Sequence, residues 1–126
     1  MNEWNVRRIQ HVSITRPHGS DEEARRFYGE ILGLTEIAVP ESLSDMDLIW
    51  YQVGADELHL VGEENPNNGS SARHFTIEVD DLEALRRQLA SAGVAIQVVT
   101  PIPGRPRFFV TDPFGNGIEF TEIQAS

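Results

Sequence analysis

The sequence predicts an α+β fold made of two tandem modules, each with the element order βαβββ, whose curved mixed sheets enclose a cleft. A strand-like segment, an amphipathic helix and three further strand-like segments occur twice in the same order. The glycines expected to end the two helices, Gly33 and Gly93, are 60 residues apart. A polar stretch of low β-propensity separates the two sets. We therefore expect one domain over residues 1–126, with modules at about 6–62 and 73–123 and a linker at about 63–72.

Module one begins with a predicted strand at 7–14, in which apolar and polar side chains alternate. The following helix is expected to start at Ser20, which forms a capping box with Glu23, and to end at Gly33. Three strands are then predicted, at about 34–39, 47–53 and 57–61. The apolar residues of the helix recur at the spacing of one helix face: Ala24, Phe27, Tyr28, Ile31 and Leu32.

Module two repeats this pattern. A strand is predicted at 73–79, followed by a helix that starts at Asp80, with Glu83 three residues on, and ends at Gly93. Leucines at 82, 85 and 89 form the apolar stripe of this helix. Three more strands are predicted at about 94–99, 107–111 and 117–123, and the last two are joined by a turn-rich segment at 112–117.

The composition excludes several classes of function. The chain has 10 Lys and Arg, 20 Asp and Glu and no Cys, so its formal net charge is −10. Nucleic acids and anionic membranes bind basic surfaces, and neither is expected as a partner. Without Cys there is no Cys-ligated zinc, no iron–sulfur cluster and no thiolate nucleophile. The N-terminus does not resemble a signal peptide and no apolar run could span a membrane, so a cytoplasmic location is expected.

Four polar side chains occupy related positions on the predicted strands. Alternate residues of a strand point to opposite faces, and His11 and His74 lie on the polar faces of the first strand of each module. His59 and Glu119 lie on the last strands and are 60 residues apart, so they also correspond. If the two sheets curve towards each other about a pseudo-twofold axis, these four side chains converge in one cleft.

Three imidazoles and one carboxylate suit one divalent metal ion such as Zn, Ni, Fe, Mn or Co. A single His on a strand is more often a hydrogen-bonded structural residue, but the equivalent positions in the repeat favour metal binding. Trp50 and Phe109, on strands related by the repeat, are candidate substrate-binding residues. Arg107 is a third candidate because a guanidinium can hold a carboxylate, although a solvated arginine is the more common case.

Several short motifs accompany these positions: Ile9-Gln10-His11-Val12, residues 27–34 (FYGEILGL), Leu58-His59-Leu60, His74-Phe75-Thr76-Ile77 and residues 109–120 (FVTDPFGNGIEF). In these motifs the chain resembles the vicinal oxygen chelate superfamily, the group of glyoxalases, bleomycin resistance proteins and extradiol dioxygenases. The resemblance covers about residues 6–123. It implies paired βαβββ modules that form a cleft, usually within a homodimer. It also implies metal ligands at His11, His59, His74 and Glu119.

The resemblance implies a metal-dependent enzyme that acts on a small substrate with vicinal oxygens through an enediolate-type intermediate. Lyase or isomerase chemistry like that of glyoxalases is expected first, with Glu119 as the base and His59 as the alternative. Thr15 and Glu63 stand where glyoxalase I-like enzymes carry Arg and Asn, which argues against glutathione as a co-substrate.

Extradiol dioxygenase chemistry is the second expectation. The two His and one Glu of such enzymes would be His11, His74 and Glu119, and His59 would be a further ligand or a nearby acid. The alternative from another class is a protein of the same fold that sequesters a small molecule or an antibiotic without turnover. Metal content separates the enzyme from the binding protein.

Overall fold

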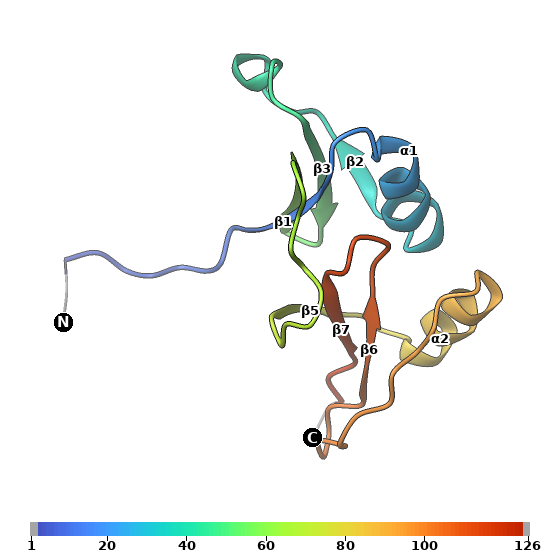
Figure 1. The fold of residues 1–126 in the computed structure, drawn as a ribbon. Helices are drawn as coiled ribbons and strands as arrows, with labels where there is room; N and C mark the ends of the chain where they lie inside the picture. Colours follow the sequence, from blue (N-terminus) through green and yellow to red (C-terminus); the bar gives the residue numbers. More distant parts are fainter. Residues whose placement is uncertain (1–2, 125–126) are drawn as a thin grey trace.

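The computed structural model describes residues 3–124, which form two mixed sheets with the helices at 21–31 and 82–91 on one side of them (Figure 1). The first sheet has four strands in the order β1-β4-β3-β2, and the second has three in the order β5-β7-β6. β1 is parallel to β4 and β5 is parallel to β7, while the other neighbours are antiparallel. Within residues 3–124, every helix is too short or too polar to span a lipid bilayer.

Each module supplies one sheet. Module one contains β1 (His11–Pro17), α1 (Asp21–Ala24), η1 (Arg25–Ile31), β2 (Thr35–Ile37), η2 (Glu41–Leu43), β3 (Leu48–Val53) and β4 (Asp56–Glu63). Module two contains β5 (His74–Glu78), α2 (Leu82–Ser91), β6 (Arg107–Thr111) and β7 (Gly117–Thr121). The α+β class and the tandem modules are thereby confirmed, but the sheets are not closed around a cleft within the described chain.

The strand register confirms the internal repeat. In module one Ser13 pairs with His59 across β1 and β4. In module two Thr76 pairs with Glu119 across β5 and β7. The two parallel pairs therefore carry the same register, and His59 and Glu119 occupy equivalent positions in three dimensions as well as in sequence.

The first helix differs from its prediction in two ways. Ser20 does not cap it, because its hydroxyl donates to the carbonyl of Pro17 at 2.5 Å and the capping box with Glu23 does not form. After one α-helical turn the helix continues as a π-helix, η1. This wider winding buries two adjacent aromatic side chains, Phe27 and Tyr28, on the same face. The predicted end is correct, since Gly33 has a φ of +74°.

Module two also departs from its prediction at two places. The cap of α2 is Asp81, whose carboxylate accepts a hydrogen bond from the Ala84 N–H at 3.0 Å, and Asp80 is not the cap. The predicted strand at 94–99 is wrong except for one bridge, in which Gln97 pairs with Phe109. Glycine and proline follow soon after in this segment, and they favour turns over a continuous ladder.

The strand predicted at 7–14 begins later, at His11, and runs on to Pro17. The Gln10 carbonyl still accepts a hydrogen bond from the Glu57 N–H at 3.1 Å. Residues 3–9 have no such backbone partner within the described chain. A strand needs a neighbouring strand to satisfy its backbone groups, so the alternating pattern here does not become part of the sheet.

One hydrophobic core connects the two modules. A buried hydrogen bond also links them, because the Tyr28 hydroxyl on η1 donates to the Asp112 carboxylate at 2.5 Å. Two asparagines add further ties, since the side-chain amides of Asn68 and Asn116 both donate to the Thr15 carbonyl. The buried core residues are Ala24, Phe27, Tyr28, Ile49, Tyr51, Leu58, Leu60, Leu89, Phe108, Val110, Ile118 and Phe120.

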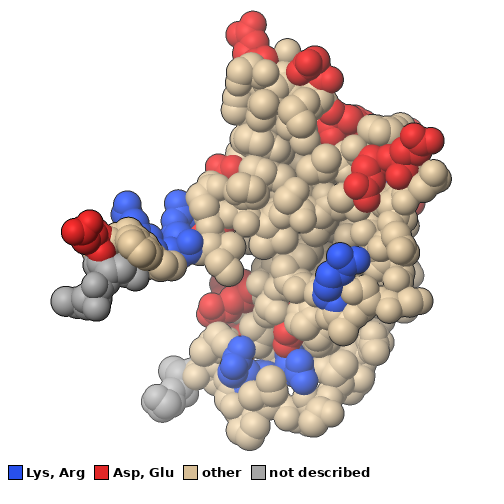
Figure 2. Space-filling model, turned by 60° about the vertical axis from the view of Figure 1, so that its left-hand side comes forward, with Lys and Arg blue, Asp and Glu red and all other residues tan. Residues whose placement is uncertain are grey.

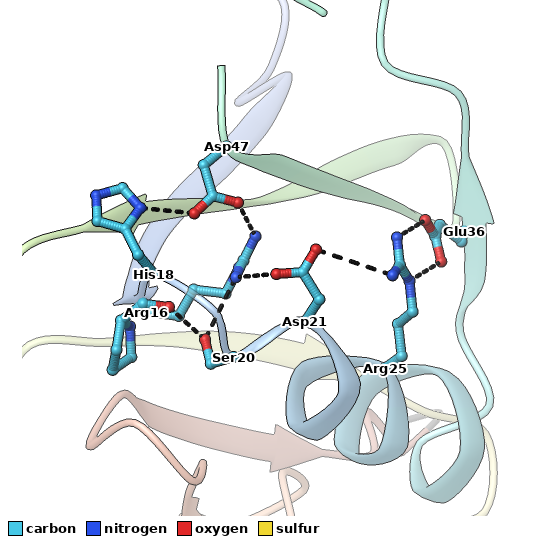
Figure 3. Close-up of polar contacts among 8 residues, drawn as sticks. Arg16, His18, Ser20, Asp21, Arg25, Glu36 and Asp47 are labelled. Carbon is cyan, nitrogen blue, oxygen red and sulfur yellow. Dashed lines mark hydrogen bonds and ion pairs between the residues drawn. The ribbon is translucent and has the colours of Figure 1, made fainter. Parts of the chain in front are cut away.

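A buried arginine, Arg16, connects the end of β1, the start of the first helix and the loop before β3 (Figure 3). The guanidinium of Arg16 is fully buried and contacts Asp47 at 2.7 Å and Asp21 at 3.0 Å. His18 contacts the other carboxylate oxygen of Asp47 at 2.7 Å. The network holds the loop before β3 against the end of β1 and the start of the helix.

Because His18 contacts Asp47, we expect this carboxylate to make a contribution to the free energy of unfolding that depends on pH. The hydrogen bond from His18 is the largest cause that lowers the pKa of Asp47, and burial opposes it. A carboxylate with a lowered folded-state pKa stabilises the protein above its unfolded-state pKa, and this contribution is lost as the pH falls through the folded-state value. We expect His18→Ala to reduce stability at neutral pH, with the difference from wild type shrinking below about pH 4.

Urea unfolding between neutral and acidic pH measures this difference. Asp45→Asn, a change at an exposed carboxylate two residues from Asp47, is the control and should change stability little at any pH. A difference between wild type and His18→Ala that stays constant over this pH range would show that the contact does not perturb Asp47.

Candidate functional site

Two pairs of the predicted side chains lie close together, one pair in each module. In module one the rings of His11 and His59 stack with their centroids 4.1 Å apart. Trp50, directly opposite His59 on β3, stacks on the other face of His59 at 3.9 Å. His59 is therefore enclosed between two rings and is only 8% exposed.

The imidazoles of module one have carboxylate and amide partners. His59 Nε2 lies 2.9 Å from Glu57 Oε1, and His11 Nδ1 lies 2.6 Å from Gln10 Oε1. The hydrogen bond from His59 is the largest cause that lowers the pKa of Glu57 below its usual value. Glu57 and His59 are two residues apart on β4, so their position on one face was visible in the sequence, although their contact was not predicted.

The second pair lies in module two. His74 Nε2 is 3.3 Å from Glu119 Oε1, and the same oxygen accepts a hydrogen bond from the Thr76 hydroxyl at 2.8 Å. The other carboxylate oxygen contacts Arg107 Nη1 at 3.1 Å. Glu119 is 7% exposed, so its carboxylate has three partners in a nearly buried position. Thr76 shares a face of β5 with His74, but the sequence alone did not predict its contact.

The charge state of Glu119 follows from these contacts. Burial raises the pKa of its carboxyl group, but the hydrogen bonds from Thr76 and Arg107 and the charge of Arg107 outweigh burial. The pKa therefore lies below its usual value, and the group is a carboxylate at neutral pH. A metal ion or a cationic group is a suitable partner for such a carboxylate.

The predicted substrate-binding residues lie beside the two pairs. Phe109 is directly opposite Glu119 on β6 and makes an edge contact with His74, with centroids 4.7 Å apart. Trp50 holds the corresponding place opposite His59. Arg107 lies over the Phe109 ring, with its guanidinium carbon 5.7 Å from the centroid. Its guanidinium also donates to the Thr100 carbonyl, so Arg107 has two protein partners, Glu119 and Thr100.

Both pairs face away from the helices. Leu58 and Leu60 are buried in the core, so the side chain between them, His59, points to the opposite face of the sheet. Ile118 and Phe120 place Glu119 in the same way. The four predicted ligands therefore share the open side of the two sheets, as the alternation in sequence indicated.

The two pairs do not form one cluster within a single chain. Among residues 3–124, no three His, Cys, Asp or Glu side chains lie close enough together to hold a metal ion. A groove of about 570 Å³ runs between the modules, from β1 across to β5, and reaches His74. Polar side chains line much of it: Ser13, Thr15, Glu63, Asn67, Asn68, Arg73 and Asn116.

Fold and sequence together define the class of this protein. The family model described as the Glyoxalase/Bleomycin resistance protein/Dioxygenase superfamily matches residues 8–120. The chain belongs to this superfamily, as its motifs predicted. A comparison with curated proteins finds no match.

Solved structures agree with this assignment. A glyoxalase family protein from Bacillus anthracis is 36% identical, with a TM-score of 0.90 over 98% of this chain and 100% of that chain. A lactoylglutathione lyase from Agrobacterium tumefaciens is 18% identical, with a TM-score of 0.69 over 91% and 92% of the two chains. The fosfomycin resistance protein FosX from Listeria monocytogenes is 12% identical, with a TM-score of 0.76 over 93% and 91%. The last two share the fold alone.

Proposed function

We propose that this protein is a divalent-metal-dependent enzyme that acts on a small substrate with two adjacent oxygens. The observation that supports this most is the pair of half-sites, His11 with His59 and His74 with Glu119, at equivalent positions on the open side of the two sheets. Their nitrogen and oxygen donors suit Zn, Ni, Fe, Mn or Co. Glyoxalase-like lyase or isomerase chemistry is our first choice, and extradiol dioxygenase chemistry is our second.

The donors fit one metal ion only if a second copy of the chain brings the two half-sites together. One chain offers no group of three donors within the described residues. Its modules cannot fold onto each other without breaking the shared core and the Tyr28–Asp112 hydrogen bond. A twofold axis can instead place module one of each copy against module two of the other, which completes two identical sites in a homodimer.

We assign His11, His74 and Glu119 as the metal ligands. The lone pair of an imidazole nitrogen lies in the ring plane, and the rings of His11 and His59 are only 20° from parallel. Their lone pairs therefore lie in two nearly parallel planes, and the two stacked rings cannot both bind one ion without unstacking. Two His and one carboxylate leave open positions for two substrate oxygens. A metal bound there would act as a Lewis acid that polarises those oxygens.

His59 is the residue that we assign to proton transfer, with Glu119 as the alternative. Its hydrogen bond to Glu57 orients the ring, which is the arrangement expected of a general base. The Glu119 carboxylate, bound by Thr76 and Arg107, is better placed as an anionic ligand. Trp50 and Phe109 provide aromatic surfaces on either side for the rest of the substrate.

Elemental analysis of freshly purified protein tests the metal centre. We expect about one metal ion per chain, lost in His74→Ala and kept in His18→Ala, whose imidazole lies outside the two half-sites. His59→Ala should retain the metal but lose activity on hemithioacetals or catechols. Metal-free protein that binds small molecules tightly would instead support the sequestering function.

Mixing two inactive variants tests whether the site lies between copies. His11→Ala removes a ligand from module one, and His74→Ala removes one from module two. A mixed dimer of these variants contains one intact site and one site that lacks both ligands. Random exchange of subunits makes about half of the dimers mixed, so the metal content per chain should recover to about one quarter of the wild-type value. No recovery after exchange would place the site within one chain.

A further inference from the structure

One arginine beside the second half-site has no acidic partner. The ten basic residues of this chain are all arginines, against 20 Asp and Glu. Most of them pair with carboxylates of the described residues: Arg8, Arg16, Arg25, Arg86, Arg87 and Arg107. Arg73, which directly precedes His74, takes part in no ion pair within residues 3–124. Its positive charge is therefore not neutralised by a neighbouring side chain of this part of the chain.

Contacts with the linker hold the guanidinium of Arg73 in place. Ser71 Oγ accepts hydrogen bonds from the Arg73 backbone N–H at 3.1 Å and from its Nε at 2.9 Å. Nη2 donates to the Asn67 carbonyl at 3.4 Å. Within the described chain no hydrogen bond involves Nη1, so this end of the guanidinium is left for a ligand.

The groove between the modules connects Arg73 with a candidate metal ligand. Arg73 and His74 both line it, and its volume of about 570 Å³ suits a small molecule. His74 Nδ1 lies 3.0 Å from the Ala72 carbonyl, which can only accept, so Nδ1 donates and the lone pair of the neutral ring lies at Nε2. A backbone partner of this kind orients a metal-binding imidazole. One small molecule in the groove is thus within reach of both residues.

Charge indicates which group of such a molecule Arg73 binds. Acidic side chains gather over the upper part of the visible body in Figure 2, whereas basic ones are scattered. A guanidinium matches the two oxygens of a carboxylate or a phosphate with two parallel hydrogen bonds. Glu63 also lines the groove. It repels a doubly charged phosphate more strongly than a singly charged carboxylate, and one guanidinium balances one charge, so a carboxylate fits this groove better.

We propose that the substrate carries a carboxylate, which Arg73 binds in this groove while two adjacent oxygens bind the metal at His74 and Glu119. Here the inference rests on the proposed function, and it adds the anionic group of the substrate. Arg107, the other arginine beside this half-site, already contacts the Glu119 carboxylate at 3.1 Å. Arg73 thereby determines specificity, because it favours an anionic substrate over a neutral analogue of the same shape.

Calorimetric titration of the zinc-loaded protein with two matched probes tests this assignment. Protocatechuate and its amide have the same pair of adjacent oxygens, but only the first has a carboxylate. Arg73→Ala should weaken protocatechuate binding by about tenfold or more and leave binding of the amide within about twofold of wild type. Arg73→Lys keeps the charge but not the planar fork, and it should give an intermediate loss.

The control is Arg26→Ala, which removes an exposed arginine on η1 and should leave the binding of both probes unchanged. Arg73 is exposed as well, so its replacement should not unfold the protein. The carboxylate site is contradicted if Arg73→Ala weakens both probes equally or leaves protocatechuate binding as in wild type.

Titration of the metal-free protein with benzoate separates this inference from the proposed function. The groove lies within one chain, so benzoate should shift the NMR signals of the Arg73 Nε–H and the Ser71 backbone N–H without a metal. In Arg73→Ala the Ser71 signal should no longer respond. These shifts in a protein that binds no metal would overturn the proposed function alone. A protein that binds metal but shows no such shifts, or that binds inorganic phosphate more tightly than benzoate, would overturn the carboxylate site alone.

Discussion

Asp112→Ala is expected to lower the free energy of unfolding by about 3–4 kcal/mol. Asp112 is 3% exposed and accepts the Tyr28 hydroxyl at 2.5 Å and the Asn116 side-chain amide at 2.9 Å. It also accepts the backbone N–H groups of Phe114 and Asn116, both at 2.8 Å. Alanine would leave these donors unsatisfied in a buried position, which costs more than the loss of one exposed contact.

Chemical denaturation with matched variants measures this effect. Asp80→Ala removes an exposed carboxylate and should change stability by at most about 0.5 kcal/mol. Tyr28→Phe should cost about 1–2 kcal/mol, and less than that once Asp112 is already alanine. Additive effects of the two changes, or a loss below about 1 kcal/mol for Asp112→Ala, would contradict a strong bond between the modules.

The contribution of Asp112 to the free energy of unfolding should change with pH in the direction opposite to that of Asp47. Burial is the largest cause that shifts the pKa of Asp112, and it raises the pKa despite the hydrogen bonds that oppose it. A raised folded-state pKa means that protonation favours the folded state. The contribution of this group is therefore fully present at low pH and declines as the pH rises through the unfolded-state and then the folded-state value.

Arg16→Ala is expected to cost about 3 kcal/mol. The guanidinium is fully buried and compensates the charges of Asp21 and Asp47. Its removal leaves a cavity and two carboxylates close together, although partial exposure of both carboxylates reduces their repulsion. The control is Arg87→Ala, which removes an exposed helix-surface arginine 4.0 Å from Glu83 and should cost no more than about 0.5 kcal/mol.

Gly62 provides an independent test of the same network. A Cβ at this position would lie 1.9 Å from Asp47 Oδ2, so Gly62→Ala must displace the carboxylate that Arg16 binds. We expect Gly62→Ala to be destabilising in wild type and clearly less so in Arg16→Ala, measured as a double-mutant cycle by urea unfolding. Additive costs would show that Gly62 and Arg16 act through different contacts.

Much of the fold could be predicted from local patterns. The alternation at 107–111 predicted β6 at its observed bounds, and the glycines that end both helices have the expected positive φ. Such signals depend on residues a few positions apart and on the fixed geometry of strands and helices. The wrong predictions arose where contacts with other parts of the chain overrode the local pattern. The pattern at 94–99 is strand-like, but most of it lacks a partner, and Ser20 follows the pattern of a cap, but its hydroxyl binds Pro17.

Residue spacing predicted the repeat, the face that carries each candidate ligand and the equivalence of His59 and Glu119. Period and spacing are properties of the chain, so these conclusions needed no tertiary information. The separation of the four side chains into two pairs became visible only in the packed structure. The structure also showed that Glu57 binds His59, that Thr76 and Arg107 bind Glu119, and that Tyr28 reaches Asp112. These contacts join residues on different strands or at distant positions, or depend on rotamers, and are set by how the elements pack.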